Sequence, residues 1–138
     1  MQMSNRERLL KLLLRIVGTT SLLAVGAVVM PYAWMNAMHE WLGMGPLPGD
    51  PIVGYLARSI SLFYALFGGL LWVVSLDVHR HRLVLHYLGA AIIMFGGVVF
   101  AVDQLERMPI LWSRCEGPID VAFGIVILSL NYRTHQIR

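Results

Sequence analysis

The chain has 138 residues, of which 57% are hydrophobic and 14% are charged, and its mean hydropathy is +0.66. Since a soluble domain carries about 25% charged residues, this composition excludes an ordinary soluble fold and indicates a single membrane domain covering residues 1–138. The formal net charge of +3 does not indicate a nucleic-acid partner, because the basic residues flank apolar segments and form no basic face.

A basic flank opens the chain. Its charged residues are four cations and one acid: Arg6, Glu7, Arg8, Lys11 and Arg15. An apolar segment follows at about 16–35 and is long enough to cross a bilayer. It is longer than the apolar region of a signal peptide, and Pro31 fits the cleavage pattern A-x-A poorly. We therefore expect an uncleaved membrane span in which Pro31 kinks the outer end or is accommodated by neighbouring helices.

The segment after this span, about residues 36–50, combines aromatic residues with glycine and proline. Trp34, Met38 and Trp41 recur at helical spacing, whereas the glycines and prolines from Gly43 to Gly49 end a helix. Because indole rings are enriched at the level of lipid headgroups, we predict a short interfacial helix followed by a tight loop.

The second predicted span, about residues 52–76, contains one charged residue, Arg58. A charge inside the bilayer costs about 2.5 kcal/mol or more unless it reaches the interface or finds a partner. The residues that share its helical face are mostly small: Ser61, Ala65, Gly69 and Trp72. Small residues let a neighbouring helix approach closely, so we expect this face to contact protein and not lipid.

The third predicted span covers about 84–102, and a fourth, opened by Pro118, covers about 118–132. Gly89, Gly96 and Asp103 are seven residues apart and lie along one face of the third span. One face of the fourth span carries Asp120, Gly124, Ile127 and Asn131. Small residues in all four spans are the expected helix contacts: Thr19, Gly26, Ser61, Ala65, Gly69, Gly89, Gly96 and Gly124.

The distribution of basic residues predicts the orientation. Eight of the 11 Lys+Arg lie in the N-terminal flank, in the turn after the second span or in the C-terminal tail. By the positive-inside rule these three segments are cytoplasmic. The sequence therefore predicts an all-α integral membrane protein: an antiparallel four-helix bundle with both termini in the cytoplasm and a short interfacial helix after the first span.

A polar cluster is predicted at the outer ends of the spans, formed by Arg58, Asp103, Asp120, His39 and Glu40. A guanidinium binds a carboxylate through two parallel hydrogen bonds, which offsets the cost of burying both charges. Such a cluster could bind a substrate carboxylate, a quinone carbonyl or a proton, or it could only hold the helices together. We favour the structural interpretation and predict no catalytic residue.

Three histidines, His79, His81 and His86, lie close to Asp77 in the sequence. Imidazole is a common metal and haem ligand, but this spacing matches no specific site. We favour a basic turn in contact with anionic lipid, and we predict neither a metal site nor a cofactor.

Two further features are an incomplete metalloprotease motif and a single cysteine. His39 and Glu40 begin the pattern H-E-x-x-H, but its second histidine is missing, so a zinc protease is excluded. Cys115 is the only cysteine, which excludes an intrachain disulfide. We interpret it as a tolerated residue in preference to a reactive thiol or an intermolecular disulfide partner.

Four stretches resemble the small four-helix bacterial membrane proteins grouped as DoxX-like: LLRIVGTTSLLAVG, YLARSISLFYALFGGLLWVVSLDV, HYLGAAIIMFGG and EGPIDVAFGIVILSL. The likeness covers most of the chain and is mainly topological. The stretch MNAMHEWLGMGPLPGDPIVGYLARSISLFYALFG is similar to hypothetical membrane proteins of environmental bacteria. The resemblance implies a bacterial inner-membrane location and, from some DoxX-like relatives, an accessory role near quinone-linked redox or oxidative-stress systems. It carries no catalytic residue onto this chain.

These observations favour a non-enzymatic accessory or structural subunit. Its expected surroundings are the lipid bilayer and either a membrane-protein partner or further copies of itself. Two alternatives stay open. One is a quinone-linked redox accessory protein that binds a quinone near Arg58, His39 and Asp120. The other is a small oligomeric transporter or channel, which would require self-association because a bundle of this size has little room for a pore.

Overall fold

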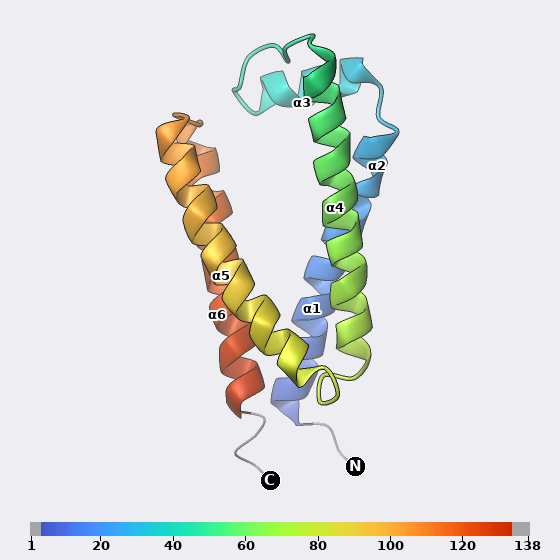
Figure 1. Cartoon of the computed structure of the whole chain (residues 1–138), viewed down its shortest axis with the longest axis vertical. Coiled ribbons are helices and arrows are strands. Elements are labelled where there is room, and N and C mark those ends of the chain that lie inside the picture. The colour runs from blue at the N-terminus through green and yellow to red at the C-terminus, as the bar shows by residue number, and fades with distance from the viewer. Residues whose placement is uncertain (1–3, 134–138) are drawn as a thin grey trace. The chain divides into compact units, whose positions relative to one another are not determined.

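The computed structural model describes residues 4–133, and its regular structure is entirely helical over that range. The helices are α1 (Asn5–Leu23), α2 (Val25–Val28), α3 (Tyr32–Trp41), α4 (Pro51–Leu76), α5 (Arg82–Leu105) and α6 (Ile110–Arg133) (Figure 1). The predicted all-α class is therefore confirmed. Contacts within the chain define two compact units, one comprising Leu14–Val73 and the other comprising the described residues before and after that segment.

Three helical segments are long and apolar enough to cross a membrane: Asn5–Val28, Pro51–Leu76 and Arg82–Leu105. Only 17%, 28% and 22% of their most apolar windows are buried in the structure, so most of their apolar surface is left for lipid. They overlap the predicted spans 16–35, 52–76 and 84–102. The first segment begins at Asn5, earlier than predicted, and ends at Val28, so residues 29–35 of the predicted span lie outside it. The fourth predicted span, 118–132, lies in α6, which is not among these three segments.

The prediction that Pro31 lies within the first span, either as a kink or accommodated by neighbouring helices, is wrong. The helical run ends at Val28, and Pro31, with φ −59° and ψ 144°, stands immediately before α3. Its carbonyl accepts hydrogen bonds from the backbone N–H groups of Trp34 (3.0 Å) and Met35 (3.2 Å). Because proline lacks an N–H and has a fixed φ, it suits the start of a helix better than its interior. The chain therefore begins a new helix at this point.

The prediction that Pro118 opens a helix is also wrong, because Pro118 lies inside α6. The helix begins at Ile110, directly after Pro109, whose carbonyl accepts the backbone N–H of Ser113 at 3.1 Å. Pro109 is thus the proline at the helix start. Pro118 has no N–H to donate to the preceding turn, a loss that is tolerated where neighbouring helices support the backbone.

Within the unit Leu14–Val73, α1 and α4 approach each other at a pair of glycines. A Cβ placed on Gly68 would lie 2.5 Å from the Gly18 carbonyl oxygen and 2.7 Å from the Leu22 nitrogen, too close for any side chain. Beside this crossing, the Trp72 indole donates to the Thr19 hydroxyl at 3.1 Å. The backbone-to-backbone contact is possible only because both residues lack a side chain.

The predicted contacts at Gly26 and Gly69 are wrong, since a Cβ on either glycine would meet open space. The true contact residue of α4 is the neighbouring Gly68. Adjacent residues point about 100° apart around a helix axis. The rest of the predicted face agrees with the structure, since Ala65 is buried and Trp72 donates to Thr19. Only the glycine of this face was misassigned by one position.

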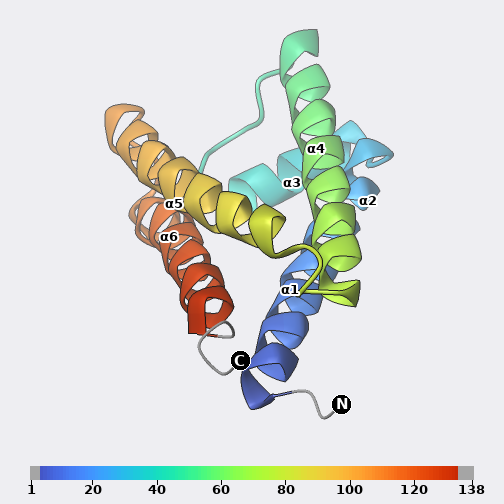
Figure 2. The same cartoon turned by 60° about the horizontal axis from the view of Figure 1, so that its bottom comes forward.

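Within the other unit, α5 and α6 lie side by side in Figures 1 and 2, and two glycine pairs bring their backbones together. A Cβ on Gly124 would lie 2.6 Å from the Gly89 carbonyl oxygen, and one on Gly117 would lie 2.6 Å from the Gly96 carbonyl oxygen. The predicted contact residues Gly89, Gly96 and Gly124 are confirmed. The sequence interpretation did not include Gly117.

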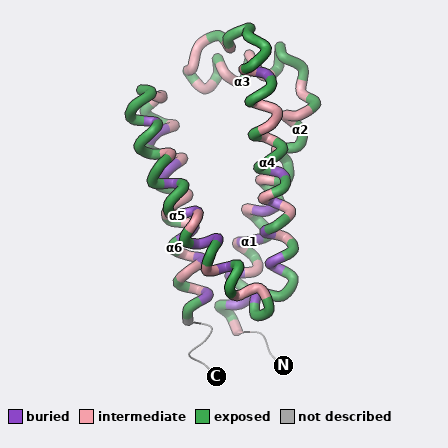
Figure 3. Tube along the Cα trace, viewed as in Figure 1, coloured by how far each residue is buried: buried purple, intermediate pink, exposed green. Residues whose placement is uncertain are grey.

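A seven-residue repeat fixes the antiparallel register of α5 and α6. Gly89 lies opposite Gly124, and Gly96, seven residues later, lies opposite Gly117, seven residues earlier. Asn131 lies seven residues after Gly124, and Arg82 lies seven residues before Gly89. The Asn131 side chain donates to the Arg82 carbonyl at 3.1 Å. Along α5 the buried residues recur on this face, as the spaced purple segments of Figure 3 show: Leu85, Leu88, Gly89, Ile92, Gly96 and Asp103.

Adjacent glycines of α5 give a matched test of this packing. We expect Gly96→Ala to lower the melting temperature of the detergent-solubilised protein, because its Cβ would lie 2.6 Å from the Gly117 carbonyl oxygen. Overpacking of this kind costs about 1–3 kcal/mol. Gly97→Ala is the control, since its Cβ would meet no atom within 4 Å, and it should leave stability unchanged or slightly raised. Equal melting temperatures for the two variants would contradict the glycine contact.

Candidate functional site

Arg58 is the charged residue inside an apolar helix, and its guanidinium is bonded to backbone carbonyls. Nε donates to the Val28 carbonyl at 3.1 Å, one terminal nitrogen donates to Met30 at 3.2 Å, and the other donates to Gly54, one turn earlier in α4, at 3.3 Å. The carbonyls of Val28 and Met30 lie at and just beyond the end of α2, where a helix leaves its last carbonyls without partners. Arg58 therefore donates to carbonyls that the end of the helix leaves without intrahelical partners.

The electrostatics of this arrangement favour a cation. Carbonyl oxygens at a helix C-terminus carry partial negative charge, and a planar guanidinium can donate to several of them at once. Arg58 thus fastens the end of α2 and the following turn to α4 inside the unit Leu14–Val73. The carboxylates predicted as its partners, Asp103 and Asp120, belong to the other compact unit, and their pairing with Arg58 stays a prediction.

His39 and Glu40, the other predicted members of the polar cluster on this side, hold the loop after α3. His39 Nδ1 lies 2.7 Å from the Gly45 carbonyl oxygen, and Glu40 Oε1 accepts the Asn36 amide at 2.9 Å. The Asn36 amide oxygen in turn accepts the Leu47 backbone N–H at 2.7 Å. These bonds fold the loop back onto α3, so both residues have structural partners.

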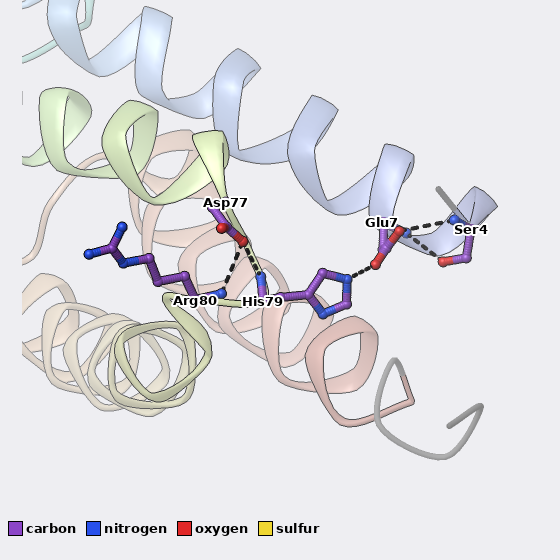
Figure 4. A network of polar contacts seen from close by, with 5 residues as sticks. All are labelled: Ser4, Glu7, Asp77, His79 and Arg80. Atoms are coloured by element: carbon purple, nitrogen blue, oxygen red, sulfur yellow. Dashed lines mark hydrogen bonds and ion pairs between the residues drawn. The ribbon is translucent and has the colours of Figure 1, made fainter. Parts of the chain in front are cut away.

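A network that the sequence interpretation missed begins at Ser4 and Glu7 (Figure 4). The Ser4 hydroxyl accepts the Glu7 backbone N–H at 3.3 Å, and Glu7 Oε2 accepts the Ser4 backbone N–H at 3.0 Å. This reciprocal arrangement is a capping box, and its signal, Ser-x-x-Glu before an apolar segment, is present at the start of the chain.

The second oxygen of Glu7 reaches a distant part of the sequence. Oε1 pairs with Nε2 of His79 in the loop between α4 and α5, and the Glu7 residue is only 8% exposed. Both residues belong to the same compact unit. The pair therefore connects the beginning of α1 to the loop that joins the other two apolar helices.

The loop itself is shaped by Asp77. One carboxylate oxygen accepts the backbone N–H groups of His79 (3.1 Å) and Arg80 (3.0 Å). The bond from the Arg80 N–H contributes most to lowering the pKa of Asp77 below its usual value. Asp77 therefore remains ionised at neutral pH, while its backbone carbonyl lies 2.9 Å from Nδ1 of His81.

The three histidines of this region have three different partners. His79 pairs with Glu7, His81 contacts the Asp77 carbonyl, and Nδ1 of His86 lies 2.8 Å from the amide nitrogen of Asn131 on α6. Over residues 4–133, no group of three His, Cys, Asp or Glu side chains is placed to hold a metal ion. The arrangement thus supports a structured polar turn.

Asp103 and Asp120 both lie where α5 and α6 meet. Asp103 is 5% exposed, and its Oδ2 has no hydrogen-bond partner among the described residues. Asp120 lies beside Gly96, since a Cβ on that glycine would be 2.9 Å from the Cβ of Asp120. Gly96 precedes Asp103 by about two turns of α5, so the two carboxylates lie at different levels of the same helix pair. Cys115 is exposed on α6.

Comparison with known proteins gives no assignment. No protein-family model, no curated protein and no solved structure matches the chain. The resemblance to DoxX-like proteins therefore stays a prediction.

Substitution of Arg58 tests the carbonyl contacts. We expect Arg58→Met to lower the free energy of unfolding in detergent by about 1–3 kcal/mol, because carbonyls at the end of α2 lose their donors. Arg58→Lys should recover only part of this loss, since an ammonium lacks the planar fork of donors. Arg114→Met, which removes an exposed arginine of α6, is the control and should have little effect. Full recovery by lysine would show that charge alone is sufficient.

The Glu7–His79 pair makes a separate prediction, measured by thermal unfolding of Glu7→Gln, His79→Ala and the double variant. Because the two side chains contact each other, we expect a coupling free energy of about 0.5–3 kcal/mol. Glu106→Gln, at an exposed acid, combined with His79→Ala provides the control and should give additive effects. Additivity of the Glu7 and His79 substitutions would mean that the contact contributes nothing.

Proposed function

We propose that the chain is a small, non-enzymatic accessory or structural protein of the bacterial inner membrane. In this proposal α1, α4, α5 and α6 form an antiparallel four-helix bundle with both termini in the cytoplasm, and α3 lies at the membrane interface. The observation that carries the proposal is the bonding of Arg58 to the carbonyls of Val28, Met30 and Gly54. The charged side chain inside the apolar helix donates hydrogen bonds to backbone carbonyls.

Other polar residues of the long helices are used in the same way. The Ser61 hydroxyl donates to the Ala57 carbonyl at 2.8 Å, and the Asn131 amide donates to the Arg82 carbonyl at 3.1 Å. Where water is absent, polar groups must find such partners inside the protein. The Ser61 bond lies within α4, whereas the Asn131 bond joins α6 to α5. Polar groups that are bonded to the protein's own backbone in this way favour an accessory or structural role.

The exposed surface supports a lipid environment and contact with another membrane protein. Large apolar side chains such as Phe63 (72% exposed), Tyr87 (72%) and Met94 (68%) project from the long helices. Such exposed apolar side chains can be covered by lipid or by the helices of another membrane protein.

Crosslinking in native membranes tests the proposal. We expect a photoreactive residue in place of exposed Ile119 on α6 to capture one membrane protein in stoichiometric amount. The same photoreactive residue in place of Ile127, which is fully buried on the same helix, is the control and should capture no other protein.

Two outcomes of the accompanying purification would contradict the accessory role. A quinone in the lipid extract of the purified protein would favour the redox alternative. A symmetric oligomer that conducts ions in liposomes would favour the transporter or channel.

A further inference from the structure

The Glu7–His79 pair brings the charged ends of three apolar helices into one region of a single compact unit. Arg6 and Arg8 flank Glu7 at the beginning of α1, Arg80 follows His79 in the loop after α4, and Arg82 is the first residue of α5. These four arginines form what we call the basic end. Arg6, Arg8 and Arg80 are exposed, and Arg82 is half-buried.

The acids of this region do not cancel the positive charge. Glu7 is nearly buried and paired with His79, and Asp77 directs one carboxylate oxygen to backbone N–H groups of its own loop. The arginines therefore outnumber the acids. In Figure 4 the Arg80 side chain extends away from Glu7, and therefore away from the part of α1 that carries Arg6 and Arg8 on either side of Glu7.

We propose that the basic end binds the headgroups of anionic phospholipids, so that the protein selects these lipids from a mixed bilayer. The helices on either side indicate where the basic end lies in the bilayer. α4 ends and α5 begins at this loop, and both helices are apolar enough to span a membrane. A loop between two spans lies at the level of the headgroups. Guanidinium groups bind phosphate oxygens through paired hydrogen bonds, and a spread-out set of cations matches a layer of phosphates.

The test uses the full chain reconstituted in nanodiscs of phosphatidylcholine with a minority of phosphatidylglycerol. After mild extraction, native mass spectrometry gives the ratio of the two lipids that remain bound. Wild type should retain phosphatidylglycerol in excess of its share in the bilayer. Arg6→Gln combined with Arg80→Gln should lower this excess by about fivefold for each arginine removed.

The matched control is Arg107→Gln combined with Arg114→Gln, which also removes one exposed arginine from a loop and one from a helix. It should retain the wild-type ratio. Helix content by circular dichroism and gel-filtration profile establish that both double variants are folded. As an independent readout, the excess of phosphatidylglycerol around wild type should fall as salt is added.

Three results would overturn the proposal: an unchanged lipid ratio in the Arg6/Arg80 variant, an equal loss in the control, or an excess that salt does not affect. Adding excess glycerol phosphate separates the two sources of the phosphate group. If the soluble ester displaces the lipid, the basic end is a site for free phosphate esters and the lipid assignment is wrong. If the lipid stays bound, the membrane headgroup is the ligand.

Discussion

The close approach of helix backbones at paired glycines is the contact on which both compact units depend. Lipid tails are as apolar as leucine, so burying apolar side chains gives little drive for helices to associate in a membrane. Backbones that nearly touch gain dispersion contacts along the whole crossing. Gly18 meets Gly68 in one unit, and Gly89 meets Gly124 in the other. The glycine positions therefore decide which faces of the helices meet.

Once this register is set, it determines where polar side chains find partners. Asn131 reaches the Arg82 carbonyl because each lies seven residues from a member of the Gly89–Gly124 pair. Arg58 follows the same logic in α4, where it lies close enough to the end of α2 to donate to its free carbonyls. In a medium without water, these bonds replace solvation. The helix packing thus determines which polar groups come close enough to form hydrogen bonds.

Composition and periodicity predicted the long helices and the glycine face of α5, because both depend on patterns within a single segment. They misplaced the α4 contact at Gly69, since two adjacent glycines leave the helical face ambiguous. They chose Pro118 over Pro109 as a helix start for a similar reason, as either proline fits the rule. The carbonyl partners of Arg58 could not be predicted. Every residue has a backbone carbonyl, so the sequence does not indicate which carbonyls accept hydrogen bonds from Arg58. The Ser4–Glu7 capping box was visible, but its reach to His79 depends on tertiary structure.

The seven-residue repeat of α5 also gives a physical reason for burying Asp103. Continued beyond Gly96 and Gly117, the same register places Asp103 at the level of Ile110, the first residue of α6. The first turn of a helix has backbone N–H groups without intrahelical partners and carries partial positive charge. A carboxylate at that level is stabilised by the field of the helix even though its Oδ2 has no hydrogen bond. The repeat therefore has polar residues at the helix ends and glycines at the crossing between them, so one pattern serves both packing and charge.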